Sequence, residues 1–150
     1  QTVLVSAGDS RTPDADPLDD NRHGTLVAGI VAARVNNTTG GAGIAPGLRL
    51  RIIRCFSGQG IGEDDDIARG VVYAVQSGCR VLNCSFGDIY PSQLLEDAFA
   101  YAVASGLAVV ASAGNTTGRR PHYPSDSAGS FRFPRQTTAL PVAELSFSGP

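Results

Sequence analysis

The sequence contains no tryptophan or methionine, no block of basic residues and no long apolar run. Its net charge is −2 and its pI is near 5.6, which argues against a nucleic-acid partner. It lacks the stretch of about 20 apolar residues that a membrane-spanning helix needs, and its polar N-terminus does not resemble a signal peptide. We therefore expect neither nucleic acid nor a membrane as a partner. The 150 residues, 42% of them apolar, suffice for one domain with a proper core.

The chain has three cysteines, an odd number. Cys55 and Cys84 lie inside strand-like runs, where a cysteine usually behaves as a small buried hydrophobe. We expect these two and Cys79 to be structural. The sequence supports no disulfide pairing and leaves the cellular compartment open.

Strand-like and helix-like segments alternate in the middle of the chain. Residues 48–56 and 80–86 have the pattern of strands, and the short apolar run 107–111 has that of a strand buried on both faces. Residues 63–78 and 91–105 have the periodicity of helices, each followed or closed by a glycine. This order predicts an α/β fold, a parallel sheet covered by helices on both faces.

Residues 25–33 are all small or aliphatic, which predicts a helix buried on nearly all sides. His23 stands directly in front of this helix. Either the histidine merely ends a loop and bonds locally, or the helix holds its imidazole at the mouth of a site. The acidic loop 14–20 precedes it; solvation alone explains such a run, and its charge would also favour a protonated imidazole.

Polar residues also follow two of the predicted strands, in 83–87 and 112–115. Ser85 could simply cap a turn, and Asn115 after a glycine is a common turn residue. Strand ends and helix starts meet at the carboxyl edge of a parallel sheet, however, so His23 should lie near both. An imidazole that moves protons, a carboxamide that stabilises an oxyanion and a strand edge that pairs with a peptide together suggest acyl transfer.

Three motifs, HGTLVAGIVAA, VLNCSFG and VVASAGN, resemble those of the subtilisin-like serine peptidases and occur in the family's order. Further similarity at 35–46, 122–125 and 146–150 extends the resemblance over residues 14–150. It implies that residues 1–150 form a single subtilisin-like peptidase domain that hydrolyses polypeptides. It also implies roles for His23 as general base and Asn115 as oxyanion donor, and substrate binding by Ser85, Phe86, Gly87, Ala113 and Gly114.

The chain departs from the family pattern in several places. Leu26 stands where the family has a second histidine, and Arg22 where it has glycine or serine. The nucleophile motif Gly-Thr-Ser does not occur, and the surroundings of Ser148 suggest a strand edge rather than a nucleophile. We place residues 2–6 on the family's second strand and expect the catalytic Asp strand upstream and the Ser helix downstream, so that the domain is incomplete. An alternative makes Asp9 the orienting carboxylate.

Other expectations also follow from the resemblance. Many members bind calcium where this chain has Asn37 and the backbone oxygens of Val35, Thr39 and Gly41; an ordinary Asn/Gly loop is the alternative. No cofactor is required, and a secreted or extracytoplasmic location is favoured. The chain alone should be inactive, needing the missing remainder of the domain as a partner. The alternatives are a non-catalytic peptide-binding pseudoenzyme and, from the weak glycine signal at 41–43, a nucleotide-binding domain.

Overall fold

The computed structural model describes residues 2–7, 18–115, 121–127 and 129–132, with the backbone alone for 2–7 and 131–132. In this part of the chain a five-stranded sheet has the order β2-β1-β3-β4-β5, and every neighbouring pair of strands is parallel. The elements are β1 (Thr2–Ala7), α1 (His23–Ala32), β2 (Leu50–Phe56), α2 (Asp64–Gln76), β3 (Val81–Cys84), α3 (Gln93–Ala104), β4 (Ala108–Ala111) and β5 (Phe131–Arg132).

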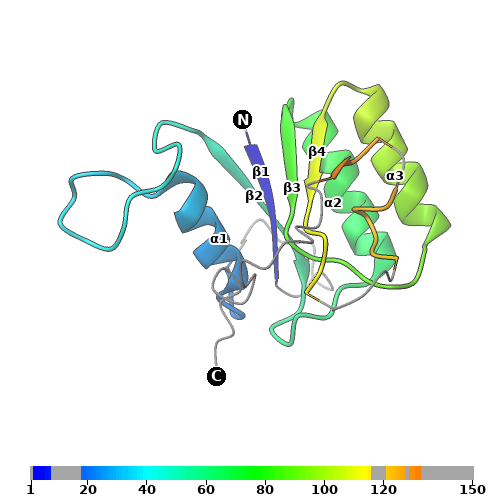
Figure 1. Ribbon diagram of the computed structural model, residues 1–150, viewed down its shortest axis with the longest axis horizontal. Helices are drawn as coiled ribbons and strands as arrows, with labels where there is room; N and C mark the ends of the chain where they lie inside the picture. The colour runs from blue at the N-terminus through cyan, green and yellow to red at the C-terminus, as the bar shows by residue number, and fades with distance from the viewer. Residues whose placement is uncertain (1, 8–17, 116–120, 128, 133–150) are drawn as a thin grey trace, which may run out of the picture.

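Helix α1 lies on one face of the sheet, and α2 and α3 pack side by side on the other (Figure 1). This arrangement confirms the α/β fold with a parallel sheet and helices on both faces. The chain builds outward from β1 to β2, then crosses back to β3 on the other side of β1. The order of strands therefore reverses between β1 and β3, and at such a reversal open α/β sheets bind their ligands.

The predicted elements are present, with small differences at their ends. A strand was expected at residues 2–6, and β1 covers it. The strand expected at 80–86 stops at Cys84, because Ser85 and the residues after it leave the ladder. The helix expected from 91 begins at Gln93, where the hydroxyl oxygen of Ser92 accepts a hydrogen bond from the N–H of Leu95. The observed strand ends differ from the predicted ones because the periodicity of a sequence does not show at which residue the hydrogen bonds between two strands stop.

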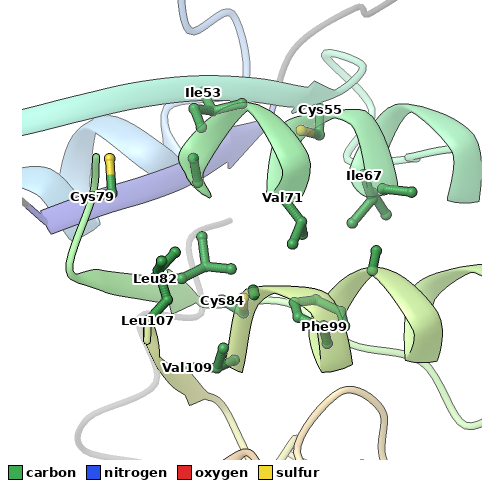
Figure 2. Packing of buried hydrophobic residues seen from close by; sticks show 14 of the residues in the cluster. Ile53, Cys55, Ile67, Val71, Cys79, Leu82, Cys84, Phe99, Leu107 and Val109 are labelled. Carbon is green, nitrogen blue, oxygen red and sulfur yellow. The ribbon is translucent and has the colours of Figure 1, made fainter. Parts of the chain in front are cut away.

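The hydrophobic core lies between the sheet and helices α2 and α3 (Figure 2). Phe99, Leu82, Val71 and Val109 are its largest fully buried apolar side chains. All three cysteines are buried and free, which confirms that they are structural. Burial raises the pKa of the Cys55 thiol to about 12 and raises those of the other two as well. Protonated, inaccessible thiols have no role as nucleophiles.

Helix α1 corrects the prediction of a helix buried on nearly all sides. Among its residues only Gly24 is buried, while Leu26 and Ile30 are 54% and 49% exposed. In the described part of the chain α1 packs mainly against β1 and has no second layer over it (Figure 1). An all-apolar helix is buried on every side only if other segments pack against every side. In the described part of the chain, other segments cover only the side of α1 that faces the sheet.

Candidate active site

His23 is the first residue of α1 and lies against the end of β3. Its Nε2 is 3.0 Å from the carbonyl oxygen of Ser85, 62 positions further along the chain. A carbonyl oxygen only accepts, so in this contact Nε2 carries the proton and donates it. The imidazole is exposed to solvent. The contact joins the segment after β1 to the segment after β3, at the point where the order of strands reverses.

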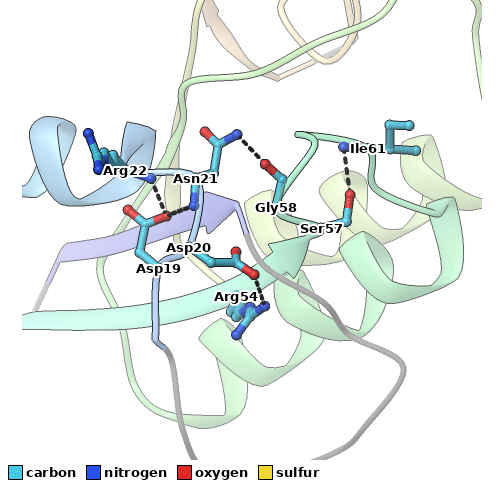
Figure 3. A network of polar contacts seen from close by, with 8 residues as sticks. All are labelled: Asp19, Asp20, Asn21, Arg22, Arg54, Ser57, Gly58 and Ile61. Atoms are coloured by element: carbon cyan, nitrogen blue, oxygen red, sulfur yellow. Dashed lines mark hydrogen bonds and ion pairs between the residues drawn. The ribbon is translucent and has the colours of Figure 1, made fainter.

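Asp19 holds the start of α1 in place. One carboxylate oxygen accepts hydrogen bonds from the backbone N–H groups of Asn21 and Arg22, at 3.0 and 2.8 Å (Figure 3). The other accepts from the N–H and the hydroxyl of Thr25, at 2.8 and 2.7 Å. The residue before the helix, Arg22, has a left-handed backbone and caps nothing with its side chain. Asp19 therefore satisfies one of the N–H groups that a helix start leaves free, that of Thr25, and two in the turn that leads into the helix.

These hydrogen bonds also change the acidity of Asp19. Partial burial acts to raise the pKa of its carboxyl, but the hydrogen bonds from Thr25, Arg22 and Asn21 outweigh burial and leave the pKa below its ordinary value of 3.8. Sequence reasoning treated this residue only as one of an acidic run. The usable signal was an acidic residue a few positions before the helix, a pattern typical of capping.

The two residues after Asp19 attach the same loop to the end of β2. The carboxylate of Asp20 lies 3.2 Å from Arg54 on β2, and Nδ2 of Asn21 donates to the carbonyl oxygen of Gly58 at 2.9 Å (Figure 3). The described end of the acidic loop thus makes specific contacts, and solvation alone does not account for it. The loop and β2 together support the position of His23.

The segments that follow β3 and β4 lie side by side. The N–H of Ser112 donates to the carbonyl oxygen of Cys84 at 3.0 Å, and its hydroxyl donates to that of Phe86 at 3.2 Å. Gly114 has a left-handed φ of 78°, which turns the chain just before the exposed Asn115. The structure thus brings residues 85–87 and 112–115 and His23 to one edge of the sheet. The roles assigned to them stay predictions.

His122 also belongs to this edge, and sequence reasoning gave it no role. Its ring lies between Gly87 and Gly114 and is largely buried. An antiparallel bridge between Asp88 and Tyr123 holds the segment in place, with backbone hydrogen bonds of 3.0 and 2.8 Å. The similarity of 122–125 to a family segment was visible in the sequence, but contact with two distant glycines is decided only by the fold.

A cavity of about 530 Å³ opens beside Phe86. Its apolar wall includes the ring of Phe56, whose centroid is 4.8 Å from that of Phe86. Three carboxylates, those of Asp64, Asp88 and Glu96, also line it, and none of the described residues that line it is basic. A cavity lined by apolar side chains and by carboxylates suits a side chain with an apolar stem and a positive tip.

Two further expectations concern the loop after α1. The glycines at 41–43 lie at the C-terminal end of α1, where the N–H of Gly43 donates to the carbonyl oxygen of Ala33. A methyl group on Gly43 would lie 2.4 Å from the backbone nitrogen of Ala33, so this glycine permits close packing. Phosphates bind at helix N-termini rather than at the negative C-terminal end. The nucleotide-binding interpretation is therefore wrong.

The calcium prediction for the same loop stays a prediction. Oδ1 of Asn37 accepts a hydrogen bond from the N–H of Thr39 at 3.2 Å, as in an ordinary turn. Calcium takes 6–8 oxygen ligands, whereas the predicted set offers the Asn37 side chain and three backbone oxygens. The described residues contain no cluster of three or more acidic, histidine or cysteine side chains suited to a metal. Alone, this set does not fit calcium.

Two further residues considered in the sequence analysis, Asp9 as an alternative orienting carboxylate and Ser148 as a rejected nucleophile, lie outside the described residues.

A sequence model of the Subtilase family matches residues 4–143. The chain belongs to the subtilase family. It is 48% identical over 102 residues to a thermophilic serine proteinase of Bacillus sp. (strain AK1), an alignment covering 68% of this chain and 25% of that protein. It is 38% identical over 122 residues to thermitase of Thermoactinomyces vulgaris, covering 81% of this chain and 44% of thermitase. The chain thus spans from a quarter to less than half of these relatives.

Two solved structures have a similar fold. A mutant of the protease domain of PatA aligns with a TM-score of 0.69 and 26% identity, over 86% of this chain and 54% of that one. The prenylagaramide maturation protease PagA aligns with a TM-score of 0.70 and 25% identity, over 86% and 50%. The resemblance drawn from the sequence motifs is therefore confirmed. No helix in the described residues is long and apolar enough to cross a membrane.

Proposed function

We propose that this chain is the central part of a serine endopeptidase, with His23 as general base and Asn115 as oxyanion donor. A peptide pairs through its backbone with the edge formed by Ser85, Phe86 and Gly87. The serine that attacks the peptide carbonyl gives its proton to Nε2 of His23, which returns that proton to the leaving amine. The serine and the carboxylate that orients the imidazole are expected in the remainder of the domain.

The contact between Nε2 of His23 and the carbonyl oxygen of Ser85 carries the proposal. It brings the titratable group and the peptide-binding edge within one hydrogen bond of each other, although they belong to elements far apart in sequence. In the reactive state Nε2 must be free to accept a proton, so it exchanges this carbonyl for the serine hydroxyl. The exposure of the ring permits that exchange.

The surroundings of the edge support a peptide as the substrate. The hydroxyl of Ser112 ties the second segment to the carbonyl oxygen of Phe86, so both sides of the edge are held at a set distance. The cavity beside Phe86 receives a further side chain of the peptide, and its carboxylates favour lysine or arginine there. A location outside the cytoplasm is a part of this proposal that rests on the family resemblance. So is a calcium ion near Asn37, which would need further ligands from the remainder of the domain.

A fluorophosphonate probe, which labels activated serines, tests the proposal. The 150-residue chain alone should not react, whereas the chain joined to its adjoining coding sequence should react and should hydrolyse peptides. His23→Ala should abolish both in the longer protein. Asn115→Ala should lower kcat by about 100- to 1,000-fold, because one oxyanion donor is lost.

The same experiment separates the proposal from a non-catalytic peptide-binding protein. If the longer protein binds peptides but neither reacts with the probe nor hydrolyses them, it is such a binding protein and the catalytic roles are wrong. Reaction of any serine in the 150-residue chain would instead show that this chain contains its own nucleophile.

A further inference from the structure

Asn83 places a polar side chain in the middle of the sheet. It lies on β3, which pairs with β1 on one side and with β4 on the other. Its strand neighbours Leu82 and Cys84 are fully buried in the core beneath α2 and α3. Because side chains alternate along a strand, Asn83 points to the opposite face, on which α1 lies. An amide in the middle of a sheet is unfavourable without hydrogen bonds, so the bond that it makes is informative.

The side chain of Asn83 holds Ser85. Nδ2 of Asn83 donates to Oγ of Ser85 at 2.9 Å, and the contact is partly buried. β3 ends at Cys84, so Ser85 lies just beyond the strand, where the chain leaves the ladder. Asn83 itself is fixed by the pairing of β3 with both of its neighbours. Its hydrogen bond therefore ties the first residue after the strand back to a well-supported part of the sheet.

Ser85 in turn meets the imidazole of the candidate active site. Its carbonyl oxygen lies 3.0 Å from Nε2 of His23 and accepts the hydrogen of that nitrogen. Its backbone also begins the edge with which the peptide pairs in the proposed function. The position of this one residue therefore sets the distance between the general base and the peptide. A displacement of about 1 Å near a reacting group can lower a rate about 100-fold.

We propose that Asn83 is a positioning residue, whose amide holds Ser85 so that its carbonyl oxygen faces Nε2 of His23. This inference rests on the proposed function, because it takes His23 as the general base and Ser85 as the start of the peptide-binding edge. The next residue of the edge is held from the other side, by the hydroxyl of Ser112, which donates to the carbonyl oxygen of Phe86. Asn83 acts through Ser85 and takes part in no step of the reaction itself.

The tautomer of His23 in the 150-residue chain tests this inference without any hydrolysis. The chain has two histidines, and the 15N signals of their rings at pH 8, where imidazoles are mostly neutral, show which nitrogen carries the hydrogen. The contact with Ser85 keeps the hydrogen of His23 on Nε2. Asn83→Leu keeps the volume of the side chain but removes the donor. The share of the Nε2–H tautomer should then fall to that measured in a short histidine peptide.

Two further variants accompany Asn83→Leu. Ser85→Ala removes the same hydrogen bond from its accepting side and should change the His23 tautomer in the same way, so it decides the result if Asn83→Leu does not fold. Val81→Ala is the matched control, because Val81 is half-buried on the same face of β3 and should leave the tautomer unchanged. Thermal unfolding shows which variants fold. An unchanged tautomer in both folded variants would overturn the inference.

Peptide hydrolysis by the chain joined to its adjoining coding sequence measures the catalytic consequence. Asn83→Leu should lower kcat about 10- to 100-fold, with a smaller effect on KM, because the rest of the edge still binds the peptide. Ser85→Ala should lower kcat by a similar factor. Since both changes break one hydrogen bond, the double variant should be no slower than the slower single variant. Two losses that multiply, or an unchanged kcat in Asn83→Leu, would overturn the positioning role.

The inference and the proposed function fail in different ways. If the longer protein hydrolyses no peptide although Asn83→Leu changes the tautomer of His23, the proposed function is wrong and the placement of the imidazole through Ser85 stands. If the longer protein hydrolyses peptides and Asn83→Leu alters neither the tautomer nor kcat, the proposed function stands and Asn83 has no positioning role.

Discussion

The two faces of the sheet differ in how completely they are covered. On one face α2 and α3 enclose a core in which Phe99, Leu82 and Val71 are almost fully buried. On the other, α1 packs against β1 and leaves Leu26 and Ile30 about half exposed. The candidate active site lies at the carboxyl edge between them. Stability and chemistry are therefore built by different parts of the chain: α2 and α3 close the core, and α1 carries the histidine.

The largest effect on the free energy of unfolding should come from Phe99→Ala, in the core on the covered face. The ring is 1% exposed, so its loss removes buried apolar contacts and leaves a cavity, at a cost of about 3–5 kcal/mol in the free energy of unfolding. Urea denaturation of the 150-residue chain measures this cost. Tyr101→Ala on the same helix is the control, since that ring is 46% exposed and should contribute much less. Equal effects of the two would mean that α3 does not pack as described.

The next largest effect concerns the edge between the faces. Gly87→Ala places a methyl group against the His122 ring and 2.5 Å from the carbonyl oxygen of Tyr123, and should destabilise the chain by about 1–3 kcal/mol. Gly29→Ala in α1 is the matched control, because a methyl group there meets nothing within 4 Å. It should be neutral or slightly stabilising. A harmless Gly87→Ala would show that the ring of His122 does not lie beside Gly87.

A smaller effect is expected where α1 begins. Asp19→Ala should cost about 1 kcal/mol, as loss of a helix cap does. Because the pKa of Asp19 is lowered on folding, its contribution is present above its ordinary value of 3.8 and is lost as the pH falls through the lower folded value. Urea denaturation at pH 7 and pH 3 should therefore show a smaller difference between the unchanged chain and Asp19→Ala at pH 3. An effect independent of pH would contradict the capping role.

The smallest effect should be that of Leu26→Ala on the open face. This side chain is 54% exposed, so truncation should change the free energy of unfolding by no more than about 0.5 kcal/mol in the 150-residue chain. The same change in the chain joined to its adjoining coding sequence tests whether further residues cover α1. A cost there of about 2 kcal/mol or more would show that they do. Such a cost in the 150-residue chain itself would remove the difference between the faces.

Sequence patterns predicted the helices and strands well because the residues that start and end these elements lie within or next to them in the sequence. The acidic residues before Ile67 and the glycines at 78 and 106, both with left-handed backbone, mark the start of one helix and the ends of two. Sequence patterns gave a wrong prediction where the burial of a residue depends on which other segments pack against it. The apolar residues of α1 predicted burial, but a sequence does not tell how many of its sides will have neighbours.

The sequence by itself determined the order of elements, the parallel sheet, the buried cysteines and the family, because these depend on periodicity and on ordered motifs. Only the tertiary structure decided that Nε2 of His23 meets the carbonyl oxygen of Ser85, that Asp19 holds the start of α1, and that His122 lies between two glycines. These contacts join residues from separate segments. They depend on how the crossovers bring the strand ends together in space, which no local pattern encodes.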